Sequence, residues 1–447
     1  MPGVDPGREG NGRAAGLASL PSAPDRPAGA GVSGLERARG PRPVWIALAL
    51  WGPGLMVMLA DTDVGSLATA AQSGARFGYA MVVPLVVLIP VLYLVQEMTV
   101  RLGILTGQGH AALIRRYFGR RWAAAASLAL LASALGALVT EFAGVAGVGQ
   151  MFGVPRWLSV SVAAAFLVGV ASTGSYRRSE RIGIAVGLAE LVFLPAMILS
   201  HPRLPALLSG MATIPHAAPA FLFLLAANLG AVVMPWMIFY QQGAVIDRGL
   251  TRGSIEAERR STMIGALLTQ LVMISVVVAL AATLGTSHPD STLRTVGQIA
   301  AALAPLLGGP TARVLLGAGV LGAGLVAALV ASLAGAWALA EVFGWQHSLN
   351  RRPGRDTAPF YVTYALALAA GALLVLTRTD LISLAVDAEA LNAVLLPVVL
   401  GFLLLLEARA LLPADRRQGW RRWTTVAVCG LVAALGVVAV PLSSGLR

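Results

Sequence analysis

The sequence contains no lysine, and all 33 of its basic residues are arginine. A phosphate-binding P-loop and a retinal Schiff base both depend on a lysine, so the composition argues against an ATP-hydrolysing pump and a retinal protein. The single cysteine, Cys429, excludes an intramolecular disulfide and a multi-cysteine metal cluster. The five histidines form no HExxH motif, so a zinc protease has no support.

Charged residues are also scarce. They make up 12% of the 447 residues, against 57% hydrophobic residues, and the mean hydropathy is +0.76. This composition is typical of a polytopic membrane protein and not of a soluble enzyme. Since a helix needs about 20 apolar residues to cross the hydrocarbon core, we expect about eleven transmembrane helices. The apolar segments lie near 45–75, 79–104, 122–150, 157–172, 181–200, 219–246, 261–284, 312–343, 359–377, 381–409 and 424–443.

The arginines are distributed unequally between the two sides of the membrane that these segments would cross. With the N-terminus inside, 26 arginines lie in the N-terminal region and the even-numbered loops, and seven lie on the other side. The positive-inside rule therefore predicts a multi-pass protein of the cell membrane, with a cytoplasmic N-terminus and an external C-terminus. The net charge of +12 follows from topology and gives no support for a nucleic-acid partner; no protein partner can be inferred.

Residues 1–43 hold no apolar block and are rich in Pro, Gly, Ala and Arg. We expect a disordered cytoplasmic tail there, followed by a transmembrane domain over 44–443.

Two segments are interrupted by polar or helix-breaking residues. The first segment carries Asp61, Asp63 and Gly65, and the sixth carries Asn228 and Pro235. A carboxylate at the centre of a membrane helix costs about 2.5–3.5 kcal/mol on insertion scales, so such residues usually serve a function. Asp61 and Asp63 would lie about 200° apart on an intact helix, so they can share one cavity only where the helix unwinds. The alternative is that the glycines and the proline merely kink ordinary helices.

The positions of the interrupted segments suggest an internal repeat. They are the first members of two five-helix units, about 44–200 and about 215–410, and an extra helix follows at about 424–443. Because five is odd, the second unit would enter the membrane from the opposite side. Broken helices in matching positions of an inverted repeat indicate the substrate site of a transporter.

The residues at these breaks carry a family resemblance. Gly52-Pro53-Gly54 is followed by Asp63-Val64-Gly65-Ser66, and the sixth segment reads Ala231-Val232-Val233-Met234-Pro235-Trp236. The chain thus resembles the Nramp (natural resistance-associated macrophage protein) divalent-metal transporters, which show Asp-Pro-Gly-Asn and Ala-x-x-Met-Pro-His at these places. The resemblance implies an all-α LeuT-type fold: a 5+5 inverted repeat plus one helix, with helices 1 and 6 broken at the midplane.

The resemblance also implies roles for individual residues. Asp63 stands at the metal-binding carboxylate, Met234 at the thioether ligand, Ala231 at the backbone-carbonyl ligand and Ser66 at an amide ligand. Asp61 is an additional acid that we expect to join them. The remaining candidates for the pocket or the ion pathway are Thr62, Gly65, Glu141, Asn228 and Trp236.

The chain departs from the family at two positions. Trp236 replaces a histidine and Leu138 replaces an aspartate, and the family links both lost groups to proton movement. This pattern is similar to the Nramp-related magnesium transporters. Mg²⁺ retains its water and is held through one or two carboxylates, whereas the soft sulfur of Met234 favours Mn²⁺ or Fe²⁺.

We therefore predict facilitated uptake of Mg²⁺, with Mn²⁺, by alternating access without proton coupling. The ion is the substrate, and neither a cofactor nor an enzymatic activity is implied. A proton-coupled Mn²⁺/Fe²⁺ transporter of the ordinary Nramp type, a sodium-coupled amino-acid carrier and a non-transporting sensor remain alternatives.

Further acids fall in or near the apolar segments. We expect Glu97 to be solvated or paired with arginine. Asp387, Glu389 and Asn392 begin the tenth segment and could line an outer vestibule, but we favour a solvated helix end there. Glu190 and Glu341 receive no assignment from the sequence.

Overall fold

The apolar runs of the sequence are helical, because a backbone without access to water satisfies its polar groups most simply within a helix. The computed structural model describes residues 52–215, 218–284, 293–377 and 381–444. The described helices are α2 Pro53–Asp61, α3 Val64–Phe77, α4 Val82–Thr106, α5 His110–Phe118, α6 Arg120–Met151, α7 Arg156–Ala171, α8 Tyr176–Gly187, α9 Phe193–Leu199, α10 Leu204–Ala212, α11 Pro219–Val232, α12 Pro235–Asp247, α13 Ile255–Thr283, α14 Val296–Leu307, α15 Gly309–Phe343, α16 Ala358–Leu376, α17 Leu381–Ala410 and α18 Gly419–Ser444.

These helices coincide with the eleven apolar segments expected from the sequence. In the described part of the chain, nine helical stretches are long and apolar enough to cross a membrane, and α7 is a shorter apolar helix. The span count of eleven stays a prediction. The short helices α5, α10 and α14 were not anticipated, and the expected tail at residues 1–43 lies outside the described residues.

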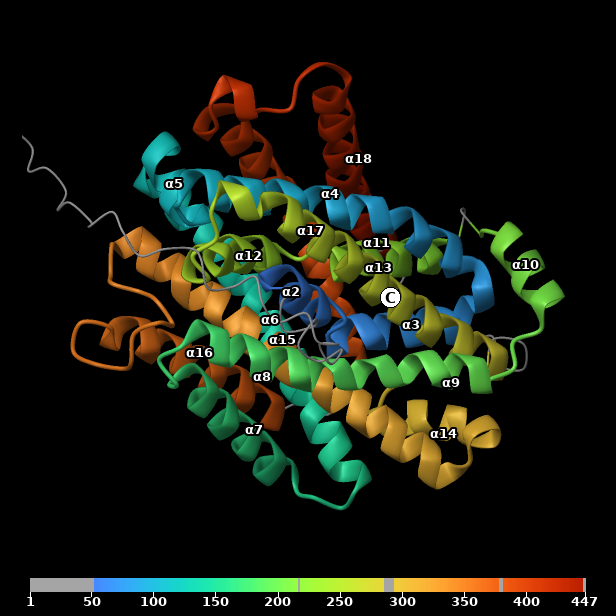
Figure 1. Cartoon of the computed structure of the whole chain (residues 1–447). Helices are drawn as coiled ribbons and strands as arrows, with labels where there is room; N and C mark the ends of the chain where they lie inside the picture. The colour runs from blue at the N-terminus through green and yellow to red at the C-terminus, as the bar shows by residue number, and fades with distance from the viewer. Residues whose placement is uncertain (1–51, 216–217, 285–292, 378–380, 445–447) are drawn as a thin grey trace, which may run out of the picture. The chain divides into compact units, whose positions relative to one another are not determined.

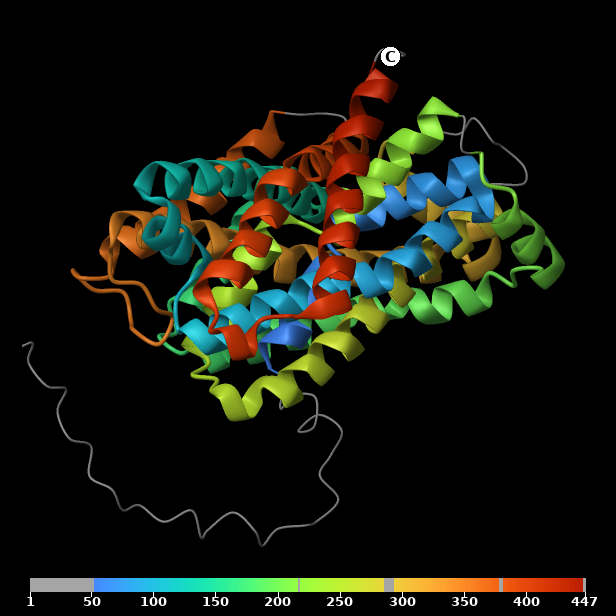
Figure 2. The same cartoon turned by 90° about the horizontal axis from the view of Figure 1, so that it is seen from above.

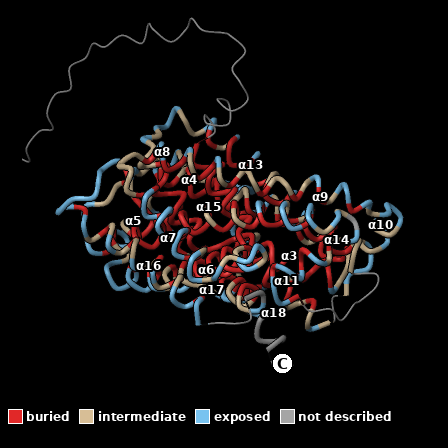
Figure 3. The backbone as a smooth tube through the Cα atoms, turned by 90° about the horizontal axis from the view of Figure 1, so that it is seen from below, coloured by how far each residue is buried: buried red, intermediate tan, exposed pale blue. Residues whose placement is uncertain are grey.

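The two halves of the interrupted first segment lie inside the bundle (Figure 1). α2 packs against α8, α12, α13 and α15, while α3 packs against α6, α11, α13 and α17. Buried residues concentrate along these central helices, and exposed ones along peripheral helices such as α7 and α16 (Figure 3). On α16 the exposed side chains include Leu366 and Leu373, at 63% and 65% exposure. Apolar side chains that face outward in this way suit contact with lipid.

The chain leaves the helical conformation at two places near the centre of the bundle. α2 ends at Asp61 and α3 begins at Val64, so Thr62 and Asp63 lie between two helices. α11 ends at Val232 and α12 begins at Pro235, with Met234 in an extended conformation. Pro235 is accommodated because the first position of a helix requires no N–H donor. α3 contacts α11, so these interruptions are brought together in space.

The last helix lies at the periphery. α18 packs along α11 and α17 and also touches α4 (Figure 2). The connection between α17 and α18 holds one short 3₁₀ turn, Pro413–Asp415.

Candidate metal site

Asp63 is the residue before α3 and caps its N-terminus. The backbone N–H of Ser66 donates a hydrogen bond to Asp63 Oδ1 over 2.6 Å. An aspartate at the N-cap of a helix commonly accepts such a bond. The side chain is completely buried, and Oδ2 has no hydrogen-bond partner among the described residues. A buried carboxylate oxygen without a partner is costly, so this atom is suited to hold a cation.

Ser66 connects the two interruptions. Its hydroxyl donates to the carbonyl oxygen of Ala231 over 3.2 Å. Ala231 lies in the last turn of α11, where carbonyl groups lack intrahelical partners. Met234 follows as the residue before α12 and is fully buried. The structure thus joins the Asp63 end of α3 to the carbonyl end of α11 through one serine side chain.

Glu389 of α17 is also part of this site, which the sequence did not indicate. A Cβ added at Gly65 would lie 2.1 Å from Glu389 Oε1 and 3.3 Å from Asp63 Oδ1, so the two carboxylates flank this glycine. Glu389 is fully buried, and its Oε1 has no hydrogen-bond partner in the described chain. The expectation of a solvated helix end at Glu389 and Asn392 is therefore wrong, because α17 packs against α3 and α11 there.

The Glu389 carboxylate is held in place by a chain of side chains. Asn392 Nδ2 donates to Glu389 Oε2 over 2.9 Å, and the hydroxyl of Ser133 on α6 donates to Asn392 Oδ1 over 2.6 Å. These bonds orient one oxygen of Glu389 and leave the other beside Gly65.

Glu141 of α6 contributes a third buried acid. Its Oε2 accepts from the backbone N–H of Val64 over 3.2 Å, at the start of α3. Its carboxyl interacts electrostatically with Asp63 and Glu389. Acids from α6 and α17 therefore converge on the N-terminal end of α3, and a bound cation would relieve their repulsion.

Asp61 is anchored separately, by α13. The hydroxyl of Thr269 donates to Asp61 Oδ2 over 3.4 Å and also forms a hydrogen bond with the hydroxyl of Thr62. Glu190 lies near this pair, interacts electrostatically with Asp61 and Asp63, and is fully buried. Asp61 Oδ1 has no hydrogen-bond partner in the described chain, and the Glu190 carboxyl interacts with the side chain of Thr62.

Asn228 and Trp236 occupy the sixth-segment side of the site. Asn228 Nδ2 donates to the hydroxyl of Ser73 on α3 over 2.9 Å and to the carbonyl of Leu224 over 2.7 Å. Its Oδ1 has no partner among the described residues, and neither has Nε1 of the fully buried Trp236. Asn228 thus connects α11 to α3 by a hydrogen bond, and its Oδ1 remains free to accept another.

The charged side chains do not form a metal cluster by themselves. Across the described ranges, no group of three or more His, Cys, Asp or Glu side chains is arranged to hold a metal ion. A ligand set here must therefore combine carboxylate oxygens with carbonyl, hydroxyl or water oxygens, or with the thioether sulfur. Such mixed oxygen sets suit hard divalent cations, and the thioether adds a preference for softer ones.

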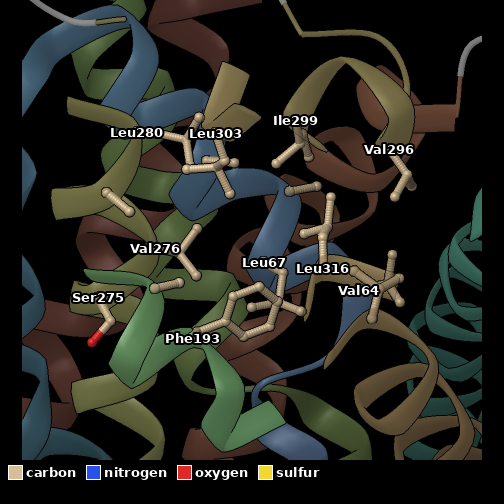
Figure 4. A pocket seen from close by; sticks show the side chains of 15 residues that line it. Val64, Leu67, Phe193, Ser275, Val276, Leu280, Val296, Ile299, Leu303 and Leu316 are labelled. Atoms are coloured by element: carbon tan, nitrogen blue, oxygen red, sulfur yellow. The ribbon is translucent and has the colours of Figure 1, made fainter. Parts of the chain in front are cut away.

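A small apolar cavity lies beside the site, next to Val64 (Figure 4). Its volume is about 20 Å³, and side chains of α3, α9, α13, α14 and α15 line it, including Leu67, Phe193 and Ile299. This volume has room for about one water molecule, and the lining is apolar except for Ser275, whose hydroxyl donates to the carbonyl of Leu271 over 2.6 Å. The cavity therefore belongs to the packing between α3 and α14 and not to the ion site.

Residues 54–441 match the family model described as natural resistance-associated macrophage protein-like (Nramp). A relative named divalent metal cation transporter MntH, from Brucella suis biovar 1, is 29% identical, and the alignment covers 65% of this chain and 66% of that relative.

Solved structures resemble the fold. A manganese transporter of Eremococcus coleocola, solved with an aromatic bis-isothiourea substituted compound, has a TM-score of 0.73 at 18% identity, covering 90% of this chain and 88% of that one. Mhp1, a nucleobase-cation-symport-1 family transporter, has a TM-score of 0.53 at 15% identity, covering 88% and 91%. The chain therefore belongs to the Nramp family, has its LeuT-type fold, and is a divalent-metal transporter of the membrane and not an enzyme.

Proposed function

We propose that the chain carries Mg²⁺ and Mn²⁺ down their electrochemical gradient by alternating access, without coupling to protons. The ion would be held by Asp63, Ser66, the carbonyl of Ala231 and Met234. The observation that carries this proposal is the bond from Ser66 to the Ala231 carbonyl beside the unpartnered oxygen of Asp63. This bond supports the proposal, because it brings oxygen atoms from both interrupted segments close together in the buried interior.

The surplus of buried carboxylates favours Mg²⁺ as a substrate. Glu389 and Glu141 surround the same end of α3 as Asp63, and Asp61 lies just before the break. Mg²⁺ gives up water reluctantly and is commonly bound through carboxylates with several waters retained. Carboxylates that surround the direct ligands can accept hydrogen bonds from the waters that the ion retains. We assign this role to Glu389 and Asp61.

Two buried side chains support transport without protons. Trp236 and Leu138 replace the titratable groups that the family links to proton movement, and both are fully buried. A Cβ added at Gly371 of α16 would lie 2.8 Å from the Cβ of Leu138, so α16 packs closely against this side chain. Of the histidines in the described ranges, His201 and His347 lie in loops, and His110 begins α5 and packs against Phe239 of α12.

The membrane potential can drive such transport by itself. It supplies about 2.3 kcal/mol per elementary charge per 100 mV, hence about twice that for a divalent ion. Because the resting potential of a cell is negative inside, this force drives a divalent cation inward.

The test is flux into proteoliposomes of the full-length protein. Mg²⁺ and Mn²⁺ uptake would be followed together with an internal pH dye, and Asp63→Ala would serve as the inactive variant. We expect uptake of both ions without acidification, and no uptake by Asp63→Ala. Mn²⁺ uptake with acidification and without Mg²⁺ uptake would overturn the proposal, and wild-type flux in Asp63→Ala would overturn the site.

The second candidate is a proton-coupled Mn²⁺ transporter. Met234 favours it, because a buried thioether next to the Ala231 carbonyl suits Mn²⁺ or Fe²⁺ better than Mg²⁺. The acidification signal in the same experiment separates the two candidates.

A further inference from the structure

A polar cavity shares no lining residue with the candidate metal site. It has a volume of about 820 Å³ and lies between α4, α13 and the connection from α17 into α18. We name it the arginine pocket, because five arginines line it: Arg101, Arg259, Arg416, Arg417 and Arg421.

Part of this positive charge is used within the protein. Glu97 on the wall of the pocket forms ion pairs with Arg101, Arg259 and Arg417, which is one of the two roles that the sequence predicted for it. Arg101 and Arg417 also pair with Glu407 of α17. These pairs join α4, α13, α17 and the α17–α18 connection, so they have a structural role.

The rest of the charge is uncompensated. Glu97, Glu256 and Glu407 compensate Arg101, Arg259 and Arg417, and Asp415 is held by Arg252 over 2.7 and 2.8 Å. In the described chain no carboxylate lies within ion-pairing distance of Arg416 or Arg421. Arg416 only donates from Nε to the carbonyl of Leu411 over 2.8 Å. A cavity with unpaired guanidinium groups is suited to bind an oxyanion such as phosphate.

The surroundings favour a phospholipid as the source of the phosphate. Trp420 lines the pocket at 73% exposure, and Trp423 follows at 68%, at the start of α18. Exposed tryptophans are typical of the level of the lipid headgroups. Along α18 the exposed side chains then become aliphatic, with Leu431 at 62% exposure. A lipid with its phosphate in the pocket could therefore lay its acyl chains against α18.

The N-terminal segment is a poorer occupant. Residues 1–51 contain six arginines and four acids, so this segment is itself basic. Basic pockets between membrane helices on the cytoplasmic side are known to bind acidic headgroups.

We propose that the arginine pocket binds the phosphate of an anionic phospholipid, with Arg416 and Arg421 as its direct ligands. The site is independent of the ion pathway, and its test does not depend on transport.

Binding would be measured on the full-length protein in detergent by native mass spectrometry. Phosphatidylglycerol would be titrated against phosphatidylcholine with the same acyl chains, and inorganic phosphate would be titrated separately. The variant is Arg416→Gln/Arg421→Gln. The matched control is Arg355→Gln/Arg422→Gln, which removes the same charge from exposed positions outside the pocket.

We expect about 30-fold weaker phosphatidylglycerol binding in the pocket variant, at about 1 kcal/mol for each arginine near the headgroup. Phosphatidylcholine binding and the control should stay unchanged. Equal losses in both double variants, or none in the pocket variant, would overturn the proposal. Displacement of phosphatidylglycerol by millimolar inorganic phosphate would show a free-phosphate site instead and would also overturn it.

The single variant Arg421→Gln tests whether weaker binding in the double variant results from misfolding. Arg421 is exposed and forms no ion pair among the described residues, so its replacement should leave the fold intact. We expect about fivefold weaker phosphatidylglycerol binding in this variant, and unchanged binding would contradict the assignment.

Discussion

Glu389 illustrates how a single residue acquires its role from its neighbours. In the sequence it stands among polar residues at the start of a segment, as a solvated helix end would. In the folded chain it is fully buried beside Gly65 and Asp63, and Asn392 orients its carboxylate. A buried carboxylate with an unpartnered oxygen beside the proposed ligand Asp63 adds attraction for a divalent cation.

Glu389→Gln tests this role. Glutamine preserves the size of the side chain and can still accept from Asn392, but it removes the negative charge. We expect Mn²⁺ affinity to fall about 10-fold or more, as is common for groups that support metal ligands. Isothermal titration calorimetry would measure it, and Glu256→Gln, an exposed carboxylate on α13, is the control. Unchanged affinity in Glu389→Gln would remove Glu389 from the site.

At the scale of the elements, the site depends on how closely α11 approaches α17. A Cβ added at Gly230 would lie 1.9 Å from the carbonyl oxygen of Glu389, closer than real atoms permit. The glycine therefore allows α11 to pack directly on the α17 backbone, next to Ala231. This is a contact between small residues of the kind that membrane helices use.

Gly230→Ala should separate these helices. Overpacking of this kind costs about 1–3 kcal/mol, so we expect a lower thermal unfolding midpoint in detergent and reduced Mn²⁺ flux in proteoliposomes. Gly401→Ala on α17 is the matched control, because a Cβ at Gly401 would meet no atom within 4 Å. Equal stability of the two variants would show that the close approach is not required.

At the scale of the whole molecule, the unequal distribution of arginine predicts orientation. Ser209, on α10, would lie outside the cell, and Asp356, before α16, would lie inside; both are exposed. In a Cys429→Ser background, a membrane-impermeant maleimide applied to intact cells should label Ser209→Cys and spare Asp356→Cys. The opposite pattern would contradict the predicted orientation.

The helices could be predicted from the sequence because each apolar run determines its own local structure. A stretch of about 20 apolar residues must form a helix in lipid, whatever its neighbours do. The short helices α5, α10 and α14 escaped prediction because they lie in the connections. A search for apolar runs long enough to span a membrane does not detect such short helices.

Part of the candidate site could be predicted for the same local reason. Asp61, Asp63 and Pro235 stand out within apolar surroundings, and their chain neighbours Ser66, Ala231 and Met234 follow from the motifs. Glu389 and the anchoring of Asp61 by Thr269 could not be predicted, since they depend on which face of α17 or α13 meets the broken helix.

The sequence by itself therefore determined the membrane class, the helical segments, the absence of lysine-based and thiol-based chemistry and the two places where helices would break. These features depend on residues close together in the chain and on their cost in lipid. Only the tertiary structure decided that Ser66 bonds to Ala231, that Glu389 joins Asp63, and that five arginines share one pocket. Those contacts are made between distant helices, and packing alone determines which helices meet.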